Sequence, residues 1–119
     1  MKEILMPAFD WIHEFPAAVT VADHRGTILA MNARSCVMFE QDGGAALIGT
    51  NLLTCHPEPA RSRLATLMAE QKVNCYTIEK RGKWKMFYQA PWFECGSYRG
   101  FVEIAMDIPP EVPHFIRKG

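Results

Sequence analysis

Cys55 and His56 are adjacent in the sequence, immediately before Pro57, and they are the two side chains best suited to chemistry. A neutral imidazole is a common iron ligand, and the positive end of a following helix activates a nearby thiol. The pair therefore suggests either an iron-ligand pair or a reactive thiol. A structural role competes with both and is favoured, because an imidazole at a helix boundary also hydrogen-bonds the chain.

Other catalytic patterns are missing from the sequence. It contains no nucleophile elbow, no glycine-rich phosphate loop and no close pair of carboxylates. His13, His24 and His114 have no nearby partner at metal-ligand spacing. We therefore expect neither an enzyme nor a metal site.

The composition narrows the class of protein further. The 119 residues suffice for one domain, and 13 Lys and Arg residues balance 13 Asp and Glu residues, so nucleic acid is an unfavoured partner. No apolar run reaches the roughly 18–20 residues of a membrane-spanning helix, and the start lacks the features of a signal peptide. We expect a cytoplasmic protein whose widely spaced cysteines stay reduced and pack as small apolar side chains: Cys36, Cys55, Cys75 and Cys95.

The elements that must position these residues begin with a helix and a hairpin. Apolar residues within residues 3–13 fit an amphipathic helix, despite Pro7 near its start. Residues 17–22 and 27–31 predict two strands joined by a turn. Asn32 is a good N-cap for a helix that ends near Phe39, and shorter helical turns follow before His56.

The second half of the chain predicts a long helix and three strands. Residues 57–72 carry apolar side chains at helical spacing, which indicates one buried stripe. Residues 73–80, 84–93 and 98–108 read as antiparallel strands. Because the last two strands are apolar on both faces, we expect the N-terminal helix or a second subunit to cover part of the outer sheet face.

This order of elements, together with local motifs, resembles the PAS family. Residues 15–28 resemble the family's opening hairpin, and Asn32 resembles the Asn at the start of its first helix. Gly49 resembles the Gly before the short central helix, and residues 100–108 resemble the last strand, which ends in Asp-Ile-Thr in the family and in Asp-Ile-Pro here. The resemblance covers nearly all of residues 14–108.

The resemblance implies an α+β fold, with a five-stranded antiparallel sheet and helices packed on one face. We accordingly divide the chain into an N-terminal amphipathic helix over residues 1–14, a PAS domain over residues 15–108 and an extended tail or linker over residues 109–119. Residues 52–59 further resemble a PAS subgroup in which Cys-His-Pro opens the long helix, found alone and beside hemerythrin-like domains.

PAS relatives use the pocket between helices and sheet for haem, flavin or a small metabolite, or fill it with side chains, and the fold does not choose among these. Haem-binding relatives place their ligand further along the long helix, where this chain has no His. Light-sensing flavin relatives have a Cys where this chain has Leu52. Haem and flavin are therefore both open as cofactors, and neither is supported by a specific motif.

The candidate pocket combines these positions with aromatic residues of the strands, which could stack on a planar ligand or simply build a core. The predicted lining residues are Asn32, Cys36, Phe39, Leu52, Cys55, His56, Leu64, Leu67, Met68, Trp84, Tyr88 and Trp92.

We expect a sensory or regulatory module that binds a small ligand or a partner and transmits the change through its N-terminal helix or dimer interface. In PAS relatives the Asp corresponding to Asp107 anchors the exit linker, so Asp107 is the candidate signal relay. A signalling protein or an output domain is the expected partner, whether the chain is free-standing or part of a longer receptor. The expected homodimer would use apolar residues near the start of the chain: Ile4, Leu5, Phe9 and Ile12.

An alternative hypothesis is a haem- or redox-sensing protein that uses Cys55 and His56.

Overall fold

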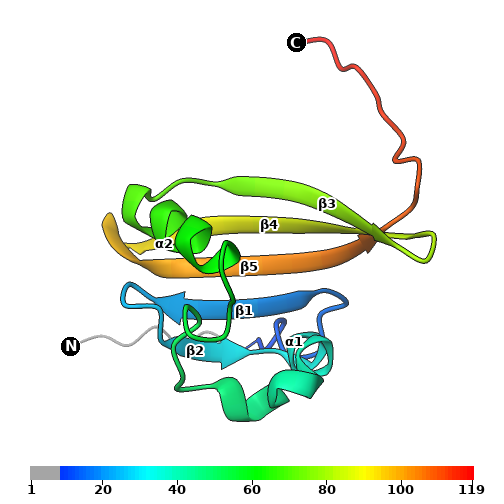
Figure 1. Cartoon of the computed structure of the whole chain (residues 1–119). Coiled ribbons are helices and arrows are strands. Elements are labelled where there is room, and N and C mark those ends of the chain that lie inside the picture. Colours follow the sequence, from blue (N-terminus) through cyan, green and yellow to red (C-terminus); the bar gives the residue numbers. More distant parts are fainter. Residues whose placement is uncertain (1–8) are drawn as a thin grey trace.

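A single five-stranded sheet forms the centre of the molecule. The computed structural model describes residues 9–119, in which the strands are β1 (Ala18–Asp23), β2 (Ile28–Met31), β3 (Asn74–Lys80), β4 (Lys83–Glu94) and β5 (Ser97–Ile108). They are arranged in the order β2-β1-β5-β4-β3, and every neighbouring pair is antiparallel (Figure 1). The predicted sheet is confirmed, including each of its five strands.

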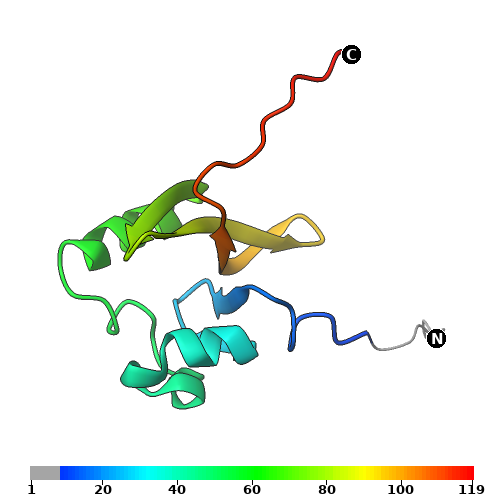
Figure 2. The same ribbon diagram turned by 90° about the vertical axis from the view of Figure 1, so that its right-hand side faces the viewer.

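The helices lie on one side of this sheet, as Figure 2 shows. They are α1 (Ala33–Met38) and α2 (Ala60–Glu70), with two short 3-10 helices, η1 (Glu40–Asp42) and η2 (Gly44–Leu47), between them. The core lies where this layer meets the sheet and contains six buried side chains, Ala22, Ile28, Leu52, Leu64, Met68 and Phe101. Leu64 and Met68 belong to the predicted stripe of the long helix, so that stripe is confirmed as the buried face.

Asn32 explains where α1 begins and how the chain before β1 is held. Its side-chain oxygen accepts hydrogen bonds from the backbone N–H of Ser35, at 3.0 Å, and of Val19, at 2.9 Å. Its side-chain nitrogen donates to the carbonyls of Ile12, at 2.9 Å, and Ala17, at 2.8 Å. A single buried amide therefore caps the helix and ties the N-terminal segment to the sheet.

Gly100 lies on β5 where the backbone of β1 leaves no room for a side chain. A Cβ atom at this position would overlap the carbonyl oxygen of Ala22 and stand 2.7 Å from Cα of Asp23. A side chain is excluded there, because contacts this short with backbone atoms require the strands to separate.

Two predicted helices differ from the structure. Residues 1–8, which include Ile4 and Leu5, lie outside the described residues, and residues 9–13 form no helix but an irregular stretch that enters a turn. The long helix begins at Ala60 rather than at residue 57, because a residue that precedes proline is disfavoured from the helical backbone conformation and Glu58 precedes Pro59.

The tail over residues 109–119 has no regular secondary structure and runs away from the sheet (Figure 1). Among the described residues, no helix is both long and apolar enough to cross a membrane.

Candidate ligand-binding site

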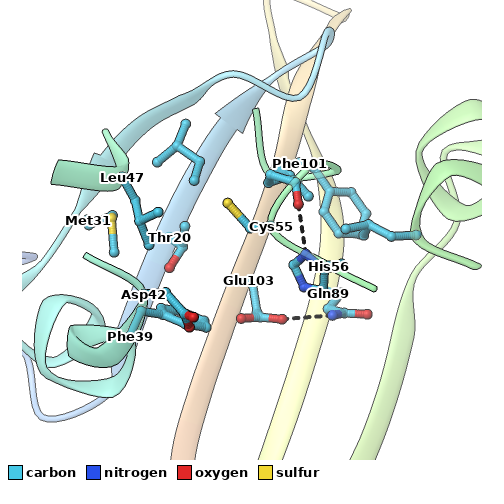
Figure 3. Close-up of a pocket in the computed structure, with 13 residues that line it drawn as sticks. Thr20, Met31, Phe39, Asp42, Leu47, Cys55, His56, Gln89, Phe101 and Glu103 are labelled. Atoms are coloured by element: carbon cyan, nitrogen blue, oxygen red, sulfur yellow. Dashed lines mark hydrogen bonds between the residues drawn. The ribbon is translucent and has the colours of Figure 1, made fainter. Parts of the chain in front are cut away.

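A cavity of about 260 Å³ lies between the inner face of the sheet and the helical layer. Most of its wall is apolar, and its polar groups come from β1, β4, β5, η1 and the turn that precedes α2 (Figure 3). Such a combination of apolar walls and a few converging polar groups is typical of small-molecule sites, although the volume is slightly below the usual range of roughly 300–1,000 Å³. The lining residues are Thr20, Ile28, Met31, Phe39, Asp42, Leu47, Leu52, Cys55, His56, Leu64, Gln89, Phe101 and Glu103.

A row of polar side chains crosses the sheet at the floor of this cavity. Asn74 of β3, Gln89 of β4 and Glu103 of β5 are directly paired in the strand register, so their side chains share one face. The Asn74 amide donates to the Gln89 oxygen at 2.9 Å, and the Gln89 amide donates to a Glu103 carboxylate oxygen at 2.7 Å. The two bonds fix the orientation of the Gln89 amide and hold Glu103 toward the cavity.

Burial raises the pKa of Glu103, because removing a carboxylate from water penalises its charged form. The hydrogen bond from Gln89 and the nearby His56 oppose this rise without cancelling it. Glu103 is therefore a carboxyl group whose charge is poorly compensated by the protein around it.

His56 comes from the turn before α2 and lies close to Glu103 and Gln89 in the cavity (Figure 3). Its Nδ1 is 2.7 Å from the carbonyl oxygen of Leu52. Since a carbonyl only accepts, Nδ1 carries the proton and Nε2 is left for the cavity. The structural role expected for His56, a hydrogen bond to the chain at the helix boundary, is present, and the same residue also lines the site.

Cys55 contributes to the wall from an exposed position, and Cys75 and Cys95 are exposed as well, so the expectation that the cysteines pack as small apolar side chains is wrong for these three. Its sulfur lies 3.6 Å from the carbonyl oxygen of Asn51 and 4.0 Å from the hydroxyl of Thr50. No group of three or more His, Cys, Asp or Glu residues able to hold a metal ion occurs within residues 9–119.

The structure brings together five of the predicted pocket residues. Phe39, Leu52, Cys55, His56 and Leu64 line the cavity, although their positions in the sequence span several elements. Leu67 lines an adjoining hollow that shares Phe39, His56, Leu64, Gln89 and Glu103 with the cavity.

The other predicted pocket residues lie elsewhere. Asn32 is only 2% exposed, and its side chain forms hydrogen bonds with backbone groups. Cys36 and Met68 are outside the lining of this cavity. Tyr88 precedes the lining residue Gln89 on β4 and so faces the opposite side of the sheet. Trp84 lies near the other end of β4, in a shallow hollow, and Trp92 donates its indole N–H to the Ala22 carbonyl at 3.0 Å.

Sequence reasoning did not select the polar floor. Gln89 and Glu103 each interrupt an otherwise apolar stretch of a central strand, where an unpaired polar group is costly. A polar residue within an apolar strand was therefore the sequence feature that could have indicated these two residues as part of the site. Six further lining residues were not singled out for the pocket: Ile28, Met31, Asp42, Leu47, Phe101 and Thr20.

The fold can now be compared with known structures. The PAS domain of BvgS from Bordetella pertussis is similar with a TM-score of 0.61 and 19% sequence identity, covering 82% of this chain and 80% of that domain. The chain has a PAS fold. No protein-family model and no curated protein matches the sequence, so the relation is visible in the structure.

Two other solved structures are similar to this chain at comparable sequence identity. A C-terminal domain from Streptococcus mutans has a TM-score of 0.68 and 16% identity, covering 83% of this chain and 81% of that one. The Aer2 receptor from Vibrio cholerae, described as a dual PAS-heme oxygen sensor, has a TM-score of 0.59 and 19% identity, covering 77% of this chain and 94% of that one. The Cys-His-Pro subgroup stays a prediction.

Haem does not fit the cavity as it is built. A macrocycle with two propionates is larger than the drug-sized ligands that fill pockets of roughly 300 Å³ or more, whereas this cavity measures about 260 Å³. Its lining also contains the carboxylates of Asp42 and Glu103, which would repel the propionates.

Proposed function

We propose that this chain is a non-enzymatic sensory or regulatory PAS module that binds a small ligand in the cavity and relays its presence to a partner. The observation that carries the proposal is the cavity itself, with apolar walls and an ordered polar floor. Its neighbours by fold include an oxygen-sensing receptor and a sensory box sensor histidine kinase from Vibrio cholerae.

A continuous chain of hydrogen bonds supports the relay. Thr20 lines the cavity, and its hydroxyl bonds the hydroxyl of Ser35 on α1, which is fully buried. The Ser35 backbone N–H donates to Asn32, and Asn32 in turn donates to the carbonyl of Ile12. A ligand that shifts Thr20 therefore changes contacts that the N-terminal segment also feels, which is the condition for coupling.

The proposed output is the N-terminal segment with its dimer partner, or a signalling protein or output domain attached to it. Ala33 strengthens the link, because its backbone N–H donates to the carbonyl of His13 at 2.9 Å. At the same end of the sheet, where the first residue of β1, Ala18, pairs with Ala105 of β5, Asp107 is exposed and lies 3.8 Å from Lys85. We propose that this contact orients the exit into the tail.

Native mass spectrometry of the purified protein tests ligand binding directly. We expect a small molecule bound to the chain, and we expect Leu47→Trp to lose it, because the indole would enter the cavity that Leu47 lines. Leu29→Trp is the matched control, since Leu29 is 48% exposed on β2. Equal retention of the molecule by both variants would place its binding site outside the cavity.

The haem hypothesis has its own test. The visible absorption spectrum of the protein after haem reconstitution should show no Soret band that depends on His56, given the size and charge of the cavity. A Soret band that disappears in His56→Ala would revive that hypothesis.

A further inference from the structure

We propose that the cavity selects a small organic cation, in which an apolar, preferably aromatic, body carries a protonated amine or amidine. This inference rests on the proposed function, because it names the ligand class for the same cavity. It follows from the charges of the lining, the hydrogen bonds of the polar floor and the character of the walls.

The charge of the lining is one-sided. Asp42 and Glu103 both contribute carboxyl groups to the cavity, whereas its lining contains no Lys or Arg. Arg63 lines only the adjoining hollow, so His56 is the one side chain of the cavity lining that can carry a positive charge. An anionic ligand would meet two carboxyl groups against this single imidazole, whereas a cation would compensate the carboxylates.

Hydrogen bonding at the polar floor also favours a cationic ligand. Gln89 uses its carbonyl oxygen for Asn74 and its amide for Oε2 of Glu103. The bonds described for residues 9–119 leave Oε1 of Glu103 as the acceptor that faces the cavity. His56, with its Nδ1 proton held by Leu52, offers Nε2 as a second acceptor when neutral. A ligand that pairs with these two acceptors must therefore carry hydrogen-bond donors.

The walls define the rest of the ligand. Phe39 and Phe101 contribute aromatic rings, and Met31 and Leu47 contribute apolar surface, to the same cavity. Aromatic faces attract a nearby cation, and they stack on flat rings. The volume of about 260 Å³ limits the body to a small ring system.

A series of three probes with one shape tests the inference. Benzamidine, benzamide and benzoate share a phenyl ring and carry a positive, a neutral and a negative head group. In two-dimensional amide NMR titrations, we expect benzamidine to shift the amides of Gln89 and Glu103 saturably and to bind about tenfold or more tighter than benzoate, since charge-assisted hydrogen bonds are the strong ones. We expect benzamide to lie between them.

Glu103→Gln should weaken this preference, because the variant keeps an oxygen to accept from Gln89 but loses one of the two lining charges. Glu79→Gln, an exposed position on β3, controls for the loss of one negative charge from the molecule and should keep the preference.

Three results would overturn the inference: tighter binding of benzoate or benzamide at the same amides, an unchanged preference in Glu103→Gln, or no shift with benzamidine. In the first two cases the cavity still binds a ligand, so they would contradict only the proposed cationic ligand class and not the proposed function. The proposed function fails separately, when the protein retains a bound molecule equally in Leu47→Trp and Leu29→Trp.

Discussion

Asn32 and Glu103 are both polar side chains between the sheet and the helices, and they differ in how completely the protein satisfies their hydrogen bonds. All four hydrogen bonds of the Asn32 amide are made to backbone groups, and the side chain is almost fully buried. Glu103 has one described bond, from Gln89, and burial raises its pKa. Fully satisfied polar groups stabilise a fold, whereas incompletely compensated ones mark sites of function.

Replacing Asn32 should destabilise the protein strongly. We expect Asn32→Ala to lower the free energy of unfolding by about 3 kcal/mol, since it removes a helix cap and leaves buried backbone groups unpaired. Asn51→Ala is the control, because Asn51 also bonds two backbone groups but in a partly exposed loop, and about 1 kcal/mol is expected. Urea unfolding measures both, and equal losses would contradict the role of Asn32.

The charge of Glu103 should make stability depend on pH in a defined direction. Its pKa in the folded protein is raised above the ordinary value of 4.5, so at lower pH the carboxyl is neutral in both states and carries no penalty. As the pH rises from the ordinary pKa toward the raised folded pKa, the unfolded state loses its proton first, so the wild type loses stability relative to Glu103→Gln.

Urea unfolding of the two proteins in mildly acidic and in neutral buffer tests this sign. Glu79→Gln serves as the reference for an exposed carboxylate on the same sheet. A wild type that gains stability relative to Glu103→Gln as the pH rises would contradict the described environment of Glu103.

Residue by residue, the sequence located the part of the site that local motifs mark. His56 and Cys55 precede the long helix, and Phe39 ends the capped one, so each could be assigned to the pocket. Gln89 and Glu103 could not, because only the register between β4 and β5 shows that they are opposite each other. Trp84 and Tyr88 were misplaced, since the face of a strand that meets the helices depends on that register.

Elements are the scale at which sequence patterns predict this fold best. Turn residues separate the strands clearly, and apolar periodicity marks α2, so all five strands and both longer helices were expected. The N-terminal helix was not found at residues 9–13, where tertiary hydrogen bonds to Ile12 and His13 replace helical ones. Propensity is a weak guide for a short segment whose backbone groups find partners elsewhere.

A substitution at Gly100 tests the close packing of β1 against β5. Gly100→Ala should cost several kcal/mol or prevent folding, because the added Cβ would overlap backbone atoms of β1. Gly96→Ala is the matched control, since Gly96 has positive φ but open space around it, and a loss of about 1 kcal/mol is expected. Thermal unfolding orders the two variants, and a smaller loss for Gly100→Ala would contradict the described strand packing.

The whole molecule leaves apolar surface available for a partner. Phe9 is 72% exposed in the N-terminal segment, which is the proposed output of the relay. Together with the half-buried Ile12 and the apolar outer face of β4 and β5, this favours the homodimer proposed from the sequence.

Sedimentation equilibrium tests the homodimer. At micromolar concentration we expect particles of twice the 13.5 kDa chain mass, and Phe9→Asp should shift them toward the monomer by placing a charge in the interface. Phe115→Asp, at a residue 70% exposed in the tail, should not. Particles of 13.5 kDa alone would count against the dimer.

The central claim is that occupancy of the cavity is felt at the N-terminal segment through Asn32. Hydrogen exchange at the amides of Phe15 and Ala33 measures it, because these amides donate to the carbonyls of Ile12 and His13. With the co-purifying molecule retained and then removed, we expect a change in protection at both amides as well as at Gln89 and Glu103. Protection that changes at Gln89 and Glu103 but stays the same at Phe15 and Ala33 would contradict it.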